Sequence, residues 1–241
     1  MEIQKIKELA RKLNLQNIYC GEIELKETGL SNLDYLYYIL NEEYEKRKEK
    51  AKDRLYKKSK LPKLDFDIDK QTGVTSWQIL ELIKLDWLNE DGNLFLIGKS
   101  GSGKTALASK IGKEATQNRK KVYYLDIYIL LEIAKHRISD NKLNAMFKYL
   151  LECDLIIIDE VMYLQPSEEE LILLYKILII LNETRSIIII TTRPLSEWME
   201  IAQDKHLMRN LIDRLSKNTQ ILNLNPIQQE VIDYTVVKKK I

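Results

Sequence analysis

The residues best suited to chemistry in this chain of 241 residues form a glycine-rich segment that ends in Lys104 and Thr105. The segment fits Gly-x-x-x-x-Gly-Lys-Ser/Thr in full and lies between a short apolar run and a helical pattern, the context that this motif requires. In such a loop, backbone N–H groups surround phosphate oxygens, the lysine contacts the β- and γ-phosphates, and the threonine hydroxyl faces Mg²⁺. A glycine-rich turn formed by chance is the alternative. We expect ATP and Mg²⁺ to bind at Gly98, Lys99, Ser100, Gly101, Ser102, Gly103, Lys104, Thr105 and Ala106.

A second candidate is the carboxylate pair Asp159 and Glu160, which follows four aliphatic residues. This pattern predicts a buried strand with both carboxylates at its carboxyl end, where ligands bind in open α/β sheets. Asp159 is then a Mg²⁺ ligand, directly or through water, and Glu160 polarises the water that attacks the γ-phosphate. The adjacent pair favours hydrolysis over phosphoryl transfer to a small molecule, because a kinase must exclude water. For Glu160, a capping or surface carboxylate is the alternative.

Thr192 is the third candidate, because it follows the apolar run 187–190. It lies at the tip of a further predicted strand, beside the strand that carries Asp159. A hydroxyl there could contact the γ-phosphate or the attacking water. A β-favouring threonine that simply closes a strand is the alternative.

The elements that must position these residues change in type near residue 94. Helical periodicity dominates the first ninety residues, and residues 64–73 are expected to form an extended linker. From residue 94, short apolar runs alternate with helical segments, which predicts an α/β fold with a five-stranded parallel sheet covered on both faces. The expected strands are 94–97, 122–125, 155–158, 187–190 and 221–224. We therefore expect a helical N-terminal domain at 1–63 and an ATPase domain at 64–241 that ends in a basic tail.

Charge is unevenly distributed, although 38 Lys and Arg against 36 Asp and Glu leave a net charge of only +2. Residues 46–63 carry ten basic and two acidic side chains, and they continue a helical pattern. Positive charge concentrated on one helix favours contact with DNA phosphates, and a solvated helix face remains the alternative. The candidate nucleic-acid contacts are Lys46, Arg47, Lys50, Arg54 and Lys57.

Composition excludes several classes of protein. Gly and Pro together number only 12, which argues against disordered and turn-dense all-β chains. No apolar run approaches the roughly 18 residues that span a bilayer, and the first residues lack the apolar core of a signal peptide. Two cysteines and two histidines are too few for a disulfide framework or a zinc site. We expect a soluble, reduced, cytoplasmic protein without a membrane partner.

Three further stretches accompany the glycine-rich loop: Asp-Glu-Val-Met-Tyr-Leu at 159–164, Arg-Pro-Leu-Ser-Glu-Trp at 193–198 and Asp-Arg-Leu at 213–215. Together they resemble the AAA+ ATPases of the initiator and loader clade, and most closely the IstB-type transposition helper ATPases of bacterial insertion sequences. The resemblance covers essentially the whole chain. It implies an AAA+ fold and an ATPase that forms a homo-oligomer on duplex DNA. It also implies that this ATPase assists an integrase-type transposase of the same element in target capture.

The same resemblance implies roles for single residues. Arg214 matches the finger that reaches into a neighbouring subunit's nucleotide, with an ordinary surface ion pair as the alternative. The basic segment between the second and third strands, with Lys135 and Arg137, matches a helix that faces nucleic acid in the initiator clade, or else forms a charged outer face. Two residues depart from the family. Thr192 replaces an Asn, and its shorter side chain is expected to position water less well. Met162 replaces a Gly, and we expect this second replacement to affect only packing.

Two other functions compete with a transposition helper. A replicative helicase loader of the DnaC type would use its N-terminal helices to grip a helicase. A small-molecule P-loop kinase is disfavoured by the Asp-Glu pair and by the position of Arg214 far downstream.

Overall fold

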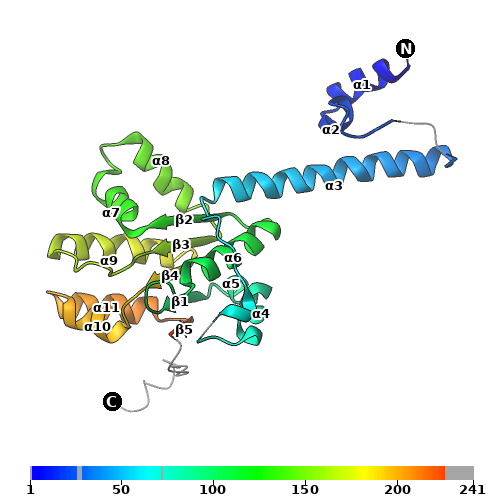
Figure 1. Cartoon of the computed structure of the whole chain (residues 1–241). Helices are drawn as coiled ribbons and strands as arrows, with labels where there is room; N and C mark the ends of the chain where they lie inside the picture. Colours follow the sequence, from blue (N-terminus) through cyan, green and yellow to red (C-terminus); the bar gives the residue numbers. More distant parts are fainter. Residues whose placement is uncertain (1, 26–28, 72, 226–241) are drawn as a thin grey trace. The chain divides into compact units, whose positions relative to one another are not determined.

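The computed structural model describes residues 2–25, 29–71 and 73–225 (Figure 1). Its contacts divide the chain into two compact units, Met1–Arg54 and Leu55–Ile241, here called the N-terminal and C-terminal units. The division falls inside the long helix α3 (Asn32–Lys58). The end of this helix and the residues just after it belong to the C-terminal unit, because Tyr56 and Leu61 pack into that unit's core. The domain boundary expected after residue 63 stays a prediction, and the expected basic tail lies outside the described residues.

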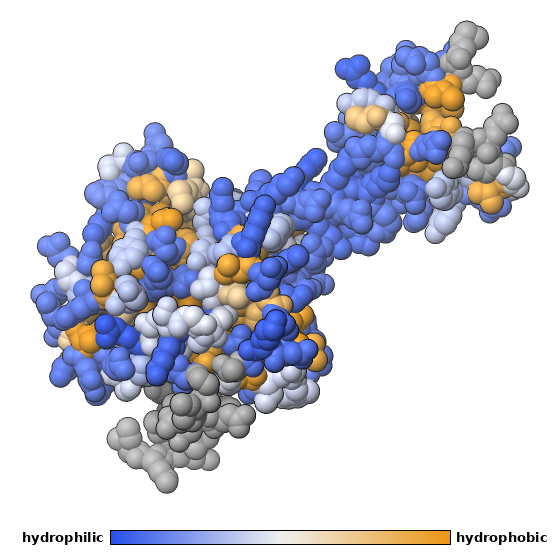
Figure 2. All heavy atoms as spheres, in the orientation of Figure 1, coloured by the Kyte–Doolittle hydropathy of each residue, from blue (hydrophilic) through white to orange (hydrophobic). Residues whose placement is uncertain are grey.

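The N-terminal unit consists of α1 (Glu2–Lys12), α2 (Gln16–Tyr19) and most of α3. Its small core contains Ala10, Ile18, Ile23 and Ile39. Other apolar side chains of α1 and α3 stay exposed within this unit, and Leu33 reaches 80% exposure. Figure 2 shows the apolar residues gathered on this unit, beside the hydrophilic surface of α3.

A five-stranded parallel sheet forms the centre of the C-terminal unit, as the sequence predicts. The strand order is β2-β3-β4-β1-β5, so β4 lies between the strand before the glycine-rich loop and the strand that ends in Asp159. The strands are β1 (Asn93–Ile97), β2 (Val122–Asp126), β3 (Leu155–Asp159), β4 (Ser186–Thr191) and β5 (Thr219–Asn223).

Helices cover both faces of this sheet. Successive side chains of each strand point to opposite faces, so the apolar residues of one strand pack against helices on both sides. Leu94 and Leu96 pack on one face with α4, α5 and α6, whereas Phe95 and Ile97 pack on the other face with α7 to α11. The helices are α4 (Ser76–Lys84), α5 (Asp86–Asn89), α6 (Lys104–Gln117), α7 (Ile127–His136), α8 (Asn141–Leu150), α9 (Glu168–Asn182), α10 (Leu195–Ile201) and α11 (Lys205–Leu215). The expected α/β class with helices on both faces is confirmed.

Local details differ from the sequence predictions in two places. The linker expected to be extended contains a short 3₁₀ turn, η1 (Ile68–Lys70), because the Asp67 carboxylate accepts the Asp69 N–H at 3.1 Å. Strand β5 begins at Thr219 instead of residue 221, since its register with β1 starts there. None of the helices in the described ranges is both long and apolar enough to cross a membrane.

Candidate active site

The glycine-rich loop connects β1 to α6, as the motif requires. Gly101 and Gly103 have φ angles of +77° and +89°, a left-handed conformation that is strained for residues with a Cβ. The loop therefore needs glycine at both positions to turn its backbone N–H groups toward one point. Helix α6 begins directly after Gly103, which places the positive end of its dipole at the loop.

Lys104 is the first residue of α6 and is 7% exposed. Its ammonium donates hydrogen bonds to the carbonyl oxygens of Gly98 at 2.7 Å and Lys99 at 2.8 Å. Burial lowers the pKa of Lys104 from its usual value, an effect that the nearby Asp159 carboxylate partly offsets. The loop thus holds a cation beside the N–H groups that would surround a phosphate.

Asp159 ends β3 and is 7% exposed. Its Oδ2 accepts hydrogen bonds from the hydroxyls of Thr105 and Tyr124, each at 2.8 Å, and its Oδ1 accepts the Glu160 N–H at 2.7 Å. Burial, followed by the charge of Asp159, raises the pKa of Tyr124 well above its usual value, so this residue stays a neutral donor.

The structure brings Thr105 and Asp159 together, although 54 residues separate them. A hydroxyl and a carboxylate in direct contact form a pair of hard oxygen ligands of the type that Mg²⁺ prefers. The residues present therefore fit the expected ion, which Thr105 and Asp159 would hold.

Glu160 follows the strand with an exposed side chain and a φ of +60°. Left-handed backbone at a non-glycine residue is uncommon and clusters at functional sites. This conformation turns the chain sharply after Asp159 and leaves the Glu160 carboxylate free of the core. The position is compatible with the role in water activation, which remains a prediction.

Met162 corrects one expectation about this turn. Its φ is +58°, so a glycine here would avoid backbone strain, and the methionine affects the backbone as well as the packing. The left-handed conformation costs a methionine on the order of 1 kcal/mol. The Met162 side chain is 3% exposed and packs into the core, which offsets that cost.

Thr192 lies just beyond β4, at the same edge of the sheet as Asp159. The strand itself ends at Thr191, whose buried hydroxyl accepts the Arg193 N–H at 3.2 Å. Thr191 therefore shapes the backbone of this turn, and its carbonyl accepts the Gly98 N–H at 3.2 Å. Thr192 is the half-buried neighbour that remains as the candidate polar contact.

The sequence did not indicate two side chains that hydrogen-bond to the backbone of the glycine-rich loop. Gln71, in the linker before the sheet, donates to the Ser102 carbonyl at 2.7 Å. Asn225, after β5, accepts the Lys99 N–H at 2.8 Å. No local pattern indicates these contacts, because they join residues 31 and 126 positions apart.

Arg214 lies in the last turn of α11, in the helix beyond β4 as expected, and is exposed. It lines a cavity of about 330 Å³ together with Asn93 and Asn218, which lie at the amino ends of β1 and β5. The glycine-rich loop begins at the other end of β1, about 16 Å away for five residues of strand. The structure therefore does not bring Arg214 to the glycine-rich loop of its own chain.

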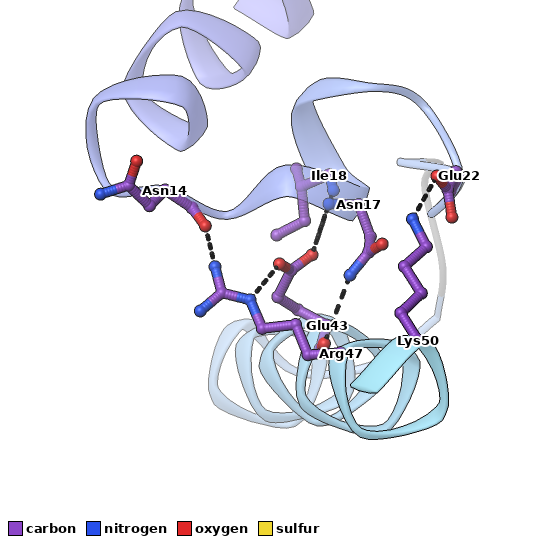
Figure 3. Close-up of polar contacts among 7 residues, drawn as sticks. All are labelled: Asn14, Asn17, Ile18, Glu22, Glu43, Arg47 and Lys50. Atoms are coloured by element: carbon purple, nitrogen blue, oxygen red, sulfur yellow. Dashed lines mark hydrogen bonds and ion pairs between the residues drawn. The ribbon is translucent and has the colours of Figure 1, made fainter. Parts of the chain in front are cut away.

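Three of the basic residues predicted to contact nucleic acid have partners inside the N-terminal unit. Figure 3 shows two of them, Arg47 and Lys50. Arg47 donates to Glu43 Oε1 at 2.8 Å and also to the Asn14 carbonyl. Lys46 and Lys50 bind the backbone and the carboxylate of Glu22, respectively. These contacts fasten the chain around α2 to α3.

Glu43 is the acidic centre of that arrangement and is 2% exposed. Its Oε2 accepts the N–H groups of Asn17 at 3.0 Å and Ile18 at 3.2 Å (Figure 3). A buried carboxylate of this kind needs a cation, which Arg47 supplies. Arg47 is therefore a structural partner as well as a candidate DNA contact.

The remaining candidate nucleic-acid contacts differ in whether their side chains already have partners. Arg54 and Lys57 are exposed, and within the described part of the chain neither forms an ion pair. Lys135 pairs with Glu170 at 3.2 Å, and the Arg137 guanidinium stacks 3.9 Å from the centre of the Phe147 ring. Of the predicted DNA contacts, Arg54 and Lys57 are thus the side chains most available to a phosphate.

Residues 8–229 match the family model described as IstB-like ATP binding protein. The chain belongs to this family. The family resemblance seen in the sequence is confirmed.

Relatives of this IstB-like chain come from bacterial insertion sequences. An IS21-like element of Bacteroides fragilis carries a protein named for ATP binding that is 30% identical over 229 residues, covering 92% of this chain and 87% of the relative. The corresponding protein named for insertion sequence IS232 of Bacillus thuringiensis subsp. berliner is 29% identical over 199 residues, with coverages of 81% and 80%.

Solved structures support the fold of this IstB-like chain. The DnaC helicase loader aligns with a TM-score of 0.50 and 20% identity, covering 62% of this chain and 87% of that one. The replication initiator DnaA bound to AMPPCP and single-stranded DNA aligns with a TM-score of 0.53 and 18% identity, with coverages of 73% and 52%. The fold is that of the AAA+ P-loop proteins.

Proposed function

We propose that this IstB-like protein is a Mg²⁺-dependent ATPase of an insertion sequence. It acts in the cytoplasm as a homo-oligomer on duplex DNA and assists an integrase-type transposase of the same element in target capture. The observation that carries the proposal is the contact of Thr105 with Asp159, beside Lys104 and the glycine-rich loop. The names of the relatives support the link to an insertion sequence.

In this proposal each side chain acts at a stated point. The loop N–H groups and the Lys104 ammonium bind the phosphates, and Thr105 and Asp159 hold Mg²⁺. When bound, the ion neutralises charge on the β- and γ-phosphate oxygens. The Glu160 carboxylate accepts a hydrogen bond from the attacking water and orients it toward the γ-phosphorus.

The exposed surface of the N-terminal unit is an argument for the proposed assembly with other chains. Exposed apolar side chains such as Leu33 and Tyr37, at 80% and 73% exposure, suit an interface that excludes water. The basic second half of α3 suits a phosphate backbone.

We expect Arg54→Gln together with Lys57→Gln to flatten the salt dependence of duplex DNA binding. Each lost phosphate contact lowers the slope of log affinity against log salt by about 0.9, so two contacts lower it by about 1.8. Fluorescence anisotropy with labelled duplexes across a salt series measures both affinity and slope. Several duplexes of different sequence should give similar values, because phosphate contacts carry no base information.

The matched control is Lys176→Gln with Lys205→Gln, which removes the same charge from exposed sites on α9 and α11. Its slope should stay near that of the original chain. If both double variants keep the original slope and affinity, α3 is a solvated face or binds a protein. Lys46, Arg47 and Lys50 are avoided here, because their replacement would also loosen the N-terminal unit.

The helicase-loader function is the second candidate, favoured by the fold shared with the DnaC loader. Footprinting on duplex DNA with and without ATP separates the two functions. A transposition helper should protect duplex DNA when ATP is present. Absence of protection, together with formation of a complex with a replicative helicase, would support the loader instead.

A further inference from the structure

Tyr124 lies on the edge strand β2, on the face of the sheet that α6 covers. In the parallel register Tyr124 stands opposite Ile157, so Asp159 is its diagonal neighbour two residues further along β3. An aromatic side chain is long enough to reach such a neighbour. The Tyr124 hydroxyl does so, at 2.8 Å from Asp159 Oδ2.

The Asp159 carboxylate has few other restraints. Within the described ranges, its Oδ1 accepts only the adjacent Glu160 N–H, and its Oδ2 accepts the hydroxyls of Thr105 and Tyr124. The Thr105 hydroxyl would face Mg²⁺ with an oxygen lone pair, while its O–H can still donate to Asp159 Oδ2. Among the described residues, Tyr124 is then the one side-chain donor to Asp159 Oδ2 that is not itself an expected Mg²⁺ ligand.

We propose that Tyr124 is a positioning residue that holds the Asp159 carboxylate in the orientation needed to bind Mg²⁺. This inference rests on the proposed Mg²⁺-dependent binding of ATP and adds a residue to that site. The Tyr124 hydroxyl contacts the Asp159 carboxylate, so its contribution should appear only when Mg²⁺ is present.

The surroundings hold Tyr124 firmly enough for this role. Its backbone N–H donates to the carbonyl of the buried residue Ser59 at 2.7 Å, just after the end of α3. Its ring packs against the apolar cluster under α6. A donor fixed at both its backbone and its ring loses little further entropy when it restrains a carboxylate.

Tyr124→Phe tests the role, because it removes the hydroxyl and keeps the ring and the backbone N–H. The probe is a fluorescent ATP analogue, titrated first in EDTA and then with increasing Mg²⁺ at a fixed nucleotide concentration. We expect the EDTA affinity to stay within about twofold of the original chain. The Mg²⁺ concentration at half-maximal effect should rise about 10-fold, the lower range for loss of a partner that orients a metal ligand.

Tyr123→Phe is the matched control. Tyr123 is the preceding residue of the same strand, but it faces the other side of the sheet and packs on Tyr149 with 5.6 Å between ring centroids. Its variant should keep the original Mg²⁺ midpoint. Tyr124→Leu, which lacks the same hydroxyl, should raise the midpoint at least as much as Tyr124→Phe and provides the second measurement if one variant folds poorly.

The outcomes separate this inference from the proposed function. If Mg²⁺ changes nucleotide binding by the original chain and the Tyr124 variants keep its midpoint, the positioning role is overturned alone. A Tyr124→Phe chain that loses affinity equally in EDTA would also overturn it, because the residue would then support the loop itself. If Mg²⁺ has no effect on the original chain, the proposed Mg²⁺ site fails and the inference with it.

Discussion

Lys104→Ala is expected to weaken ATP binding at least about 30-fold. The ammonium is nearly buried and is held by two loop carbonyls. A bound phosphate would exchange its hydrogen bonds to water for bonds to this fixed cation. Removing one partner of a desolvated charge pair costs about 2–5 kcal/mol, and each 1.4 kcal/mol is a factor of ten. Titration with a fluorescent ATP analogue measures the loss, and an affinity equal to that of the original chain would contradict the assignment.

Two comparisons sharpen this prediction. Lys110→Ala, on the same helix, removes a lysine that pairs with Glu114 at 2.7 Å on the surface, and it should bind ATP normally. Glu160→Gln should also keep ATP bound while hydrolysis falls by about 10²–10⁴-fold, because Glu160 acts on water in the transition state. Loss of binding in Glu160→Gln would mean that this residue supports the site and does not activate water.

Arg214→Ala is expected to bind ATP and to hydrolyse it about 10³-fold more slowly. Charge that develops on the γ-phosphoryl group needs a cation beyond Lys104 and Mg²⁺, and an arginine supplied by a neighbour has an effect of this size. The structure places Arg214 beside the amino ends of β1 and β5, away from its own loop. The residue is therefore available to another subunit, and activity per chain should rise with protein concentration.

The decisive measurement mixes Arg214→Ala with Glu160→Gln, each of which should be inactive alone. A mixed oligomer contains interfaces that join an intact Glu160 site to an intact Arg214, so part of the activity should return. Lys217→Ala serves as the control for the loss of a positive charge, because Lys217 is another cation that lines the same cavity. If co-assembly is demonstrated and no activity returns, or if a dilute monomer is fully active, the role in trans is refuted.

Local sequence patterns predicted a large share of the fold. The five strands appear within about two residues of their expected positions, because short apolar runs have few alternatives, and three of these strands, β1, β3 and β4, are buried on both faces. The helix expected from Thr75 also forms, and the Thr75 hydroxyl and the Gln78 side chain cap it reciprocally. The glycine-rich loop needed only its own eight residues and its neighbours to be recognised.

Other features could not be predicted, because they depend on which segments the fold brings together. The same basic residues of α3 are consistent with a DNA surface in sequence, yet Arg47 also neutralises the buried Glu43. The left-handed φ of Met162 follows from the turn that closes after β3, and side-chain type alone gives no sign of it.

The sequence by itself therefore determined the family of this protein and the residues expected to carry its chemistry, a glycine-rich loop and a carboxylate pair. These depend on residue type and short spacing, which are local properties. Only the tertiary structure decided which other side chains hold these residues in place. The strand order and the parallel register place Tyr124 beside Asp159. The fold also brings Gln71, before the sheet, and Asn225, after β5, into contact with the glycine-rich loop. Such contacts depend on register and on long-range packing, neither of which leaves a periodic signal in the chain.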